Sequence, residues 1–384
     1  MSEKQIFKVE EKAIIFNPLF LRGRLKGIVK NRYKTKMKNS IRLIFAAFLF
    51  FSTLSINAQI SLCSNPKVTT LPAPGDYGSQ GRFTVARQTV VNPEPGTPAP
   101  VSVFLPSNAS ATNRVPVIFF AHGFGGTNYQ YYEALMRQLS SNGYAVVFSP
   151  YTPDLFSSHT ARYQQLWRGF QVGVEQYGSL MDTSRVGFAG HSYGAGAVPE
   201  MARRAVVAGW GANGLFMFSA APWYSWGTNY EQIPASAKLV VQVYWDDGTN
   251  EHLIGQMDVW NRLPQITERR WQVVRSAQTV CQMLADHGVT VSGVTSTDGE
   301  INALDYWGVW RRIHALADYT FTGNQTAKPI AFGDDARMGR WRTFAALRPV
   351  TPLEATTTPV INTTSNPTFR WANRCLFALG SSCQ

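Results

Sequence analysis

The chain has 384 residues, of which 45% are apolar and 16% are charged, which is typical of a globular protein and excludes a disordered chain. The net charge of +12 belongs mainly to residues 1–58, which hold 12 basic and 3 acidic residues. Residues 59–384 hold 24 basic and 21 acidic residues and are nearly neutral, so the sequence predicts no nucleic-acid partner.

Residues 37–58 have the pattern of a secretory signal peptide. A positive segment with Lys38 and Arg42 precedes the apolar run 43–54, which is short for a membrane span, and Ala58 offers a cleavage site before Gln59. We therefore expect a secreted protein, extracellular or periplasmic, with no membrane association after signal removal. Residues 1–36 then resemble an upstream extension from a wrongly chosen start. An uncleaved signal anchor is the alternative.

Four cysteines in an exported chain predict two disulfides. Cys375 and Cys383 lie close in sequence and form the favoured pair, which leaves Cys63 with Cys281 by elimination. Alternatively, Cys281 is a buried free thiol, because its neighbours are apolar.

After a Pro- and Gly-rich leading segment, short apolar runs alternate with amphipathic stretches. The predicted strands span 82–91, 101–105, 115–121, 144–149, 185–189, 214–219, 238–244 and 270–275. The predicted helices span 129–141, 162–180, 195–205, 252–263 and 304–321. This alternation predicts an α/β domain over residues 59–321, with an eight-stranded, mainly parallel sheet flanked by helices.

Residues 322–384 break this alternation and are rich in Thr, Pro and Asn. We expect a C-terminal extension that wraps around the domain and is pinned by a disulfide. A small separate module is the alternative.

The motif Gly190-His191-Ser192-Tyr193-Gly194 lies between a predicted strand and a predicted helix. In this setting G-x-S-x-G forms a nucleophile elbow, because the glycines permit a sharp turn that exposes the serine hydroxyl above the sheet. The helix N-terminus behind the serine favours negative charge. Ser192 is therefore the candidate nucleophile, and an ordinary Gly-rich turn is the alternative reading.

A serine hydroxyl needs an imidazole to take its proton and a carboxylate to orient that imidazole. The acid is expected after a late strand, where Asp246 and Asp247 follow residues 238–244. Asp247 is the favoured acid because it lies next to the Gly248 turn, and Asp246 is the second choice. Alternatively, both carboxylates and Glu251 form a solvated or calcium-binding turn.

The histidine is expected downstream of the acid. His287 lies in an irregular segment after the last strand and is the favoured general base. His314 lies within a predicted helix and His252 is only five residues from Asp247, so both are weaker candidates. His191 should point away from the serine hydroxyl, and His159 falls in a predicted loop too early in the chain.

Two backbone N–H groups are needed for the oxyanion. One is expected from Tyr193, the residue after the nucleophile, and the other from Phe124 in the turn 121–126 (AHGFGG) after the third strand. That segment could also be an ordinary βα turn. Aromatic residues gather on the same edge and could bind an acyl or aromatic group, or belong to the core. They are Phe124, Tyr193, Trp223, Tyr224 and Trp226.

The run 181–194 (MDTSRVGFAGHSYG) resembles the D-x-S-R-[IV]-G-x-x-G-H-S-M-G segment of cutinase-like polyester hydrolases, relatives of dienelactone hydrolases in the α/β-hydrolase superfamily. Gly123-Phe124 is similar to that family's Gly-Tyr oxyanion turn. Pro222-Trp223 is similar to its Pro-Trp-His, whose tryptophan lines the substrate cleft. Residues 285–288 are less close to its Asn-His-Phe loop. The resemblance covers residues 80–290.

This resemblance implies an α/β-hydrolase fold, hydrolysis of carboxylic esters including aliphatic or aromatic polyesters, and no cofactor or metal. It implies substrate contacts from Phe124 and Trp223. The family's methionine is replaced by Tyr193 and its tyrosine by Phe124, which bears on the substrate more than on the reaction.

The sequence therefore predicts a monomeric secreted serine hydrolase that cleaves carboxylic esters through Ser192, His287 and Asp247. A lipase or short-chain carboxylesterase, or an amidase, peptidase or acyltransferase with the same site, is the alternative. A non-catalytic binding protein on the same scaffold is a third hypothesis.

Overall fold

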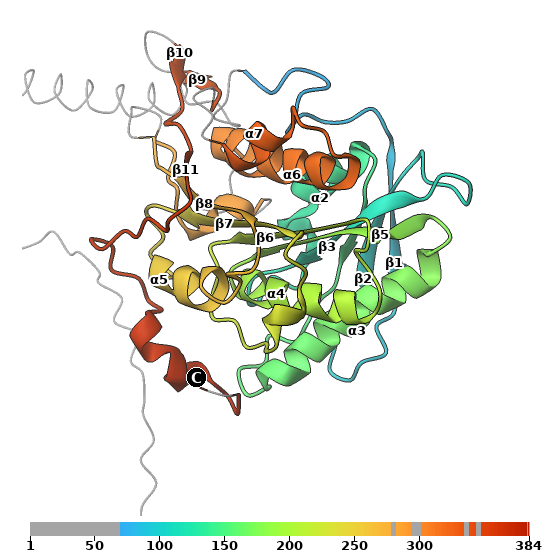
Figure 1. Ribbon diagram of the computed structural model, residues 1–384, viewed down its shortest axis with the longest axis horizontal. Helices are drawn as coiled ribbons and strands as arrows, with labels where there is room; N and C mark the ends of the chain where they lie inside the picture. The colour runs from blue at the N-terminus through green and yellow to red at the C-terminus, as the bar shows by residue number, and fades with distance from the viewer. Residues whose placement is uncertain are drawn as a thin grey trace, which may run out of the picture. The chain divides into compact units, whose positions relative to one another are not determined.

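The computed structural model describes residues 70–277, 282–292, 301–333, 338–342, 347–381 and 383. Within these residues, nine strands form one mixed sheet in the order β1-β2-β4-β3-β5-β6-β7-β8-β11 (Figure 1). The neighbouring strands from β4 to β8 are parallel, whereas β1, β2 and β11 pair antiparallel at the two edges. The strands are β1 (Val85–Val90), β2 (Val101–Pro106), β3 (Val115–Ala121), β4 (Ala145–Phe148), β5 (Met181–His191), β6 (Gly214–Ala220), β7 (Lys238–Tyr244), β8 (Glu268–Val274) and β11 (Glu354–Thr356).

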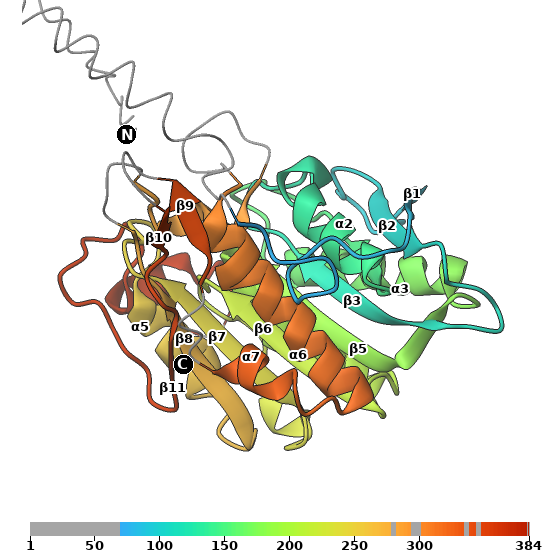
Figure 2. The same ribbon diagram turned by 90° about the horizontal axis from the view of Figure 1, so that it is seen from above.

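Helices cover both faces of this sheet. Figures 1 and 2 show α2, α6 and α7 on one face, and Figure 1 shows α3, α4 and α5 on the other. The α-helices are α2 (Glu133–Ser141), α3 (His159–Tyr177), α4 (Tyr193–Val207), α5 (His252–Gly255), α6 (Arg311–Thr322) and α7 (Lys328–Phe332). Wider π-helical turns at Gln256–Trp260 and Leu304–Trp310 adjoin α5 and α6, and 3-10 helices lie at Tyr129–Tyr131, Tyr230–Gln232, His287–Thr290 and Trp371–Phe377.

The central strand β3 is apolar along its whole length because both of its faces are covered. In β3, Ile118 and Phe120 pack into the core shared with α2 and α6. Val117 and Phe119 pack into the core shared with α3 and α4. Side chains that alternate between two cores leave no polar face, which explains the continuous apolar run in the sequence.

The α/β architecture and its mainly parallel sheet confirm the predicted fold class at this level. All eight predicted strands are present, but the count of eight is wrong, because β11 adds a ninth strand against Trp271–Val273 of β8. This strand has only three residues, and its segment lacks the alternating apolar pattern that predicts a strand.

The C-terminal extension returns along the sheet edge. After the hairpin of β9 (Arg340–Arg342) and β10 (Leu347–Pro349) it forms β11. The indole Nε1 of Trp271 then donates to the carbonyl of Val360 at 3.1 Å. The predicted disulfide between Cys375 and Cys383 is present. Cys63 and Cys281, and the predicted signal peptide, lie outside the described residues. Within the described part, no helix combines the length and apolar character that a membrane crossing requires.

Helix α4 starts unusually close to the sheet. A Cβ atom on Gly194 would lie 2.1 Å from the carbonyl oxygen of Ala121 at the end of β3. Further along, Pro199 has no N–H to donate to the carbonyl of Ala195, and the hydroxyl of Ser219 donates to that carbonyl instead at 3.0 Å. The small residue Gly194 and the hydrogen bond from Ser219 thus let the helix pack directly against β3 and β6.

We expect Gly194→Ala to lower the free energy of unfolding by about 1 to 3 kcal/mol, because the added methyl group would meet main-chain atoms that cannot move independently. Gly248→Ala is the matched control, since no described atom lies within 4 Å of its added Cβ, and it should change stability by less than about 0.5 kcal/mol. Urea titration of both variants measures the difference. Equal stability of the two variants would contradict the close approach at Gly194.

Candidate active site

Ser192 occupies a strained turn between β5 and α4. Its backbone has φ 56° and ψ −121°, a conformation that residues with side chains rarely adopt. The N–H of Ser192 donates to the carbonyl of Ala220 at 2.9 Å, and its own carbonyl accepts from the N–H groups of Gly196 and Trp223. The main chain around the serine is therefore held by β6 and its following loop.

The structure brings three predicted residues, Ser192, His287 and Asp247, into one hydrogen-bonded row. The Nε2 atom of His287 lies 2.9 Å from the Oγ atom of Ser192. Its Nδ1 atom lies 2.8 Å from Oδ2 of Asp247. Because a carboxylate only accepts, Nδ1 carries a proton and Nε2 of the neutral ring is left to accept the serine proton. This is the arrangement that general-base activation of a serine requires.

The two candidate acids differ sharply in environment. Asp247 is 2% exposed, and its Oδ1 accepts the backbone N–H groups of Thr249 and Asn250 at 2.7 and 2.9 Å. Asp246 is exposed and accepts a short hydrogen bond from the hydroxyl of Ser276. Only Asp247 faces His287. Glu251 accepts from the N–H of Trp371 at 2.6 Å.

His252 and His314, the weaker candidate bases, face other partners. His252 bonds to the carbonyl of Tyr244 through Nε2 and accepts the N–H of Asn362 at Nδ1. His314 lies in α6, where its Nδ1 is 3.4 Å from the N–H of Gly78 and from the Gln138 amide. Neither ring meets Ser192.

His191 joins the turn after β3 to the loop that holds His287. The N–H of Gly123 donates to the hydroxyl of Tyr132 at 3.0 Å, and that hydroxyl lies 3.0 Å from Nδ1 of His191. Nε2 of His191 is 2.8 Å from the carbonyl of His287. Since a carbonyl only accepts, Nε2 carries the proton and the Tyr132 hydroxyl donates to Nδ1. Burial, and secondarily the neighbouring His287, hold the pKa of His191 well below its usual value, so this ring stays neutral.

The predicted oxyanion residues flank the serine. Tyr193 is the first residue of α4, where a backbone N–H has no partner within the helix. A Cβ atom on Gly123 would lie 3.4 Å from the Cβ atom of Ser192, so the turn carrying Phe124 passes beside the serine. The rings of Phe124 and Tyr193 are 6.1 Å apart.

A buried arginine supports both of these rings. Arg162, on α3, is 2% exposed, and its guanidinium lies 5.2 Å from the Phe124 ring centroid and 5.5 Å from that of Tyr193. It donates to the carbonyl of Asp154 at 2.6 Å. A cation on the faces of two aromatic rings stabilises their placement.

The five aromatic residues predicted at this edge divide into core and surface. Tyr193 and Tyr224 are buried, Trp223 and Trp226 are partly buried, and Phe124 is 43% exposed. The Trp223 indole stacks on Tyr193 with ring centroids 5.3 Å apart, and its backbone contacts Ser192. Phe124 and Trp223 therefore both lie beside Tyr193.

Sequence reasoning did not identify the linking role of His191 or the contribution of Arg162, and it placed His159 in a loop. His159 is instead the first residue of α3, and its Nδ1 lies 2.9 Å from the Tyr193 hydroxyl. Each of these contacts joins two residues that are at least 31 positions apart in the sequence, so no local pattern indicates them.

Within the described residues, no group of three or more His, Cys, Asp or Glu side chains is arranged to hold a metal ion. No protein-family model matches the chain, and a search of curated proteins returned no match.

We expect the free energy of unfolding to fall between pH 7 and pH 5 because of His122, the residue before Gly123. Its Nδ1 bonds to the Gly123 carbonyl and its Nε2 accepts the N–H of Tyr151, and burial lowers its pKa to about 4. The unfolded chain, with a histidine pKa of about 6.5, binds more protons in this range. The stability that neutral His122 provides is thus complete above pH 6.5 and is lost as the pH falls toward 4.

At pH 5 this loss amounts to roughly 2 kcal/mol. His122→Asn, which does not titrate, should reduce the pH dependence of the free energy of unfolding by that amount in urea titrations at pH 7 and pH 5. An unchanged pH dependence would show that His122 is protonated as readily in the folded protein as in the unfolded chain.

Proposed function

We propose that this protein is a secreted serine hydrolase of the α/β-hydrolase superfamily that cleaves carboxylic esters. The observation that carries the proposal is the row of Asp247, His287 and Ser192, joined by hydrogen bonds of 2.8 and 2.9 Å. The strained serine backbone adds support, because strain of this kind persists at functional turns. The Cys375–Cys383 disulfide favours an exported protein.

In the proposed reaction, Ser192 attacks the ester carbonyl while His287 takes the hydroxyl proton at Nε2. Asp247 orients the ring and stabilises its positive charge. The N–H groups of Phe124 and Tyr193 stabilise the oxyanion of the tetrahedral intermediate. His287 then protonates the departing alcohol, and water activated by the same histidine hydrolyses the acyl-enzyme. These steps need no metal or cofactor.

The substrate class rests on the aromatic surroundings of the serine and on the resemblance to cutinase-like polyester hydrolases. Phe124 and Trp223 offer apolar surface beside Tyr193. We propose that they contact the substrate and that the substrates include polyesters with aliphatic or aromatic acyl groups. Release of soluble products from a polyester film, measured beside turnover of a short p-nitrophenyl ester, tests this extension.

Ser192→Ala should lower hydrolysis of p-nitrophenyl acetate by a factor on the order of 10⁴ or more, because no other group can form the acyl-enzyme. Initial rates of residues 59–384 and of the variant measure the loss, and labelling by an organophosphate followed by peptide mapping locates the nucleophile. A wild-type protein that neither turns over the ester nor reacts with the organophosphate would favour a binding protein. Turnover of an amide, or acyl transfer to an alcohol in preference to water, would redirect the reaction class.

Asp247→Asn should lower kcat about 10⁴-fold, since an amide in this position would favour the wrong tautomer of His287. Asp246→Asn makes the same chemical change one residue earlier, at an exposed position that does not face His287, and should alter kcat by less than about twofold. Both variants should retain the wild-type melting temperature within a few degrees. If the two variants lose activity equally, Asp247 is not the orienting acid.

A further inference from the structure

We propose that the C-terminal segment, residues 362–383, is a specificity-determining part of this active site, and that Phe377 is the positioning residue through which it acts on Trp223. The inference rests on the proposed ester hydrolase function. These residues follow helix α7 and lie outside the predicted α/β domain.

The segment first pairs with the loop that carries Asp247. The N–H of Phe369 donates to the carbonyl of Thr249 at 2.8 Å, and the N–H of Glu251 donates to the carbonyl of Phe369 at 2.9 Å. Thr249 is also one of the two residues whose N–H groups bind Asp247. The C-terminal segment therefore braces the acid loop through its main chain.

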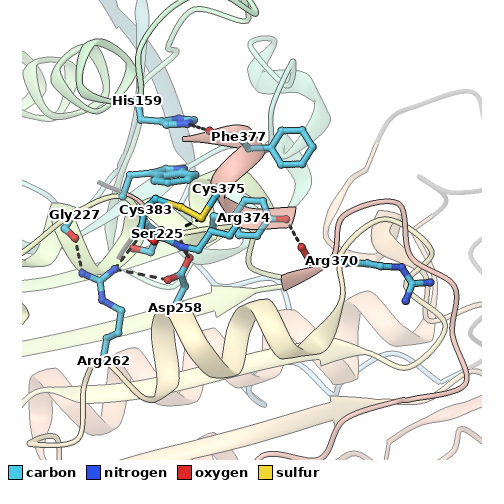
Figure 3. Close-up of polar contacts among 12 residues, drawn as sticks. His159, Ser225, Gly227, Asp258, Arg262, Arg370, Arg374, Cys375, Phe377 and Cys383 are labelled. Atoms are coloured by element: carbon cyan, nitrogen blue, oxygen red, sulfur yellow. Dashed lines mark hydrogen bonds and ion pairs between the residues drawn. A yellow bond between two sulfur atoms is a disulfide. The ribbon is translucent and has the colours of Figure 1, made fainter. Parts of the chain in front are cut away.

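The segment is then anchored by a buried arginine, Arg374, and its polar partners. Arg374 is 5% exposed, and its Nε donates to Oδ2 of Asp258 at 2.8 Å (Figure 3). Its Nη2 donates to the carbonyl of Ser225 at 3.0 Å, and its guanidinium lies 4.4 Å from the Trp226 ring centroid. A buried charge with this many partners fixes the 3-10 helix Trp371–Phe377 in one position, because any displacement would leave charges unpaired.

The position of that helix places Phe377 against the aromatic residues around Trp223. The Phe377 ring centroid lies 5.8 Å from that of Trp223 and 5.2 Å from that of Phe369. Phe369 is itself 5.7 Å from Trp223. Both rings meet the indole edge-on, while Tyr193 stacks on its face. Two of the rings that hold Trp223 thus come from the C-terminal segment.

A hydrogen-bonded chain also joins the segment to Tyr193, as Figure 3 shows for its first link. Nε2 of His159 lies 2.6 Å from the carbonyl of Phe377, and Nδ1 lies 2.9 Å from the Tyr193 hydroxyl. Since the carbonyl only accepts, Nε2 carries the proton and Tyr193 donates to Nδ1. Tyr193 supplies the proposed oxyanion N–H. Phe377 is therefore connected to both residues beside the serine, to Trp223 directly through its ring and to Tyr193 indirectly through His159.

The functional consequence concerns the acyl group of the substrate. The oxyanion forms on the acyl carbonyl, and Trp223 stacks on Tyr193, whose N–H would bind that oxyanion. We therefore assign Trp223 to the acyl side of the ester. Trp223, kept in place by Phe377 and Phe369, would form the wall for a bulky acyl group. A small acyl group such as acetyl would not reach this wall and would be insensitive to it.

Phe377→Ala tests this assignment with three esters that share one leaving group: p-nitrophenyl acetate, butyrate and benzoate. We expect KM for the benzoate to rise about tenfold, with a smaller rise for the butyrate, and kcat and KM for the acetate to stay within about twofold. Phe377→Leu, which keeps apolar bulk, should restore most of the benzoate KM. Leu376→Ala is the matched control, because this neighbouring side chain is 78% exposed.

A second variant, Cys375→Ser/Cys383→Ser, removes the disulfide of the C-terminal segment without changing the aromatic side chains around Trp223. It should shift selectivity in the same direction by a smaller factor. Organophosphate labelling of Ser192 in every variant verifies that the catalytic residues remain assembled.

The outcomes separate cleanly. A selective rise in KM for the larger acyl groups supports the assignment. Equal losses for all three esters, or no change in any, would overturn it while leaving the hydrolase proposal intact. A wild-type protein that is inactive and unlabelled would overturn the proposed function itself.

Discussion

The contact between the start of α4 and the end of β3 is the constraint on which the site depends. Only a residue without a side chain can occupy position 194, because the carbonyl of Ala121 fills the space that a Cβ would need. This approach compresses the connection between β5 and α4 into a single residue, and Ser192 absorbs the turn with a positive φ. The hydroxyl is thus presented by two rigid elements, which is how a reactive group is kept in a reproducible place.

The groups around the serine come from loops that are tied to one another. The chain from Gly123 through Tyr132 and His191 to the His287 carbonyl connects the turn after β3 with the histidine loop. His191, the second residue of the G-x-S-x-G motif, thereby joins the two loops, because each of its ring nitrogens forms a hydrogen bond. Because the groups are buried, breaking any one link would leave a polar atom without a partner, so the loops are held as a unit.

Local sequence was sufficient for much of this organisation. Continuous apolar runs such as residues 115–121 identified the central strands, and chain order after the elbow selected the residues that the structure brings together, Ser192, Asp247 and His287. Pairs such as Asp258 and Arg374, 116 positions apart, leave no periodic or spacing signal. The same holds for β11, whose three residues are a strand only because β8 offers an open edge. Tertiary contacts, rather than intrinsic preference, decide such elements.

The strand β11 also changes how the sheet meets its surroundings. Without it, the edge of β8 would present the main chain of Trp271, Gln272 and Val273, three residues that are buried in the structure. An uncovered apolar edge is a template for pairing with another chain and promotes aggregation. At the opposite edge, β1 carries the polar side chains Arg87, Gln88 and Thr89, which discourage such pairing. A shortened protein that lacks residues beyond 361 would retain β11 and stay protected, whereas one cut before Glu354 would expose the apolar edge and be prone to self-association.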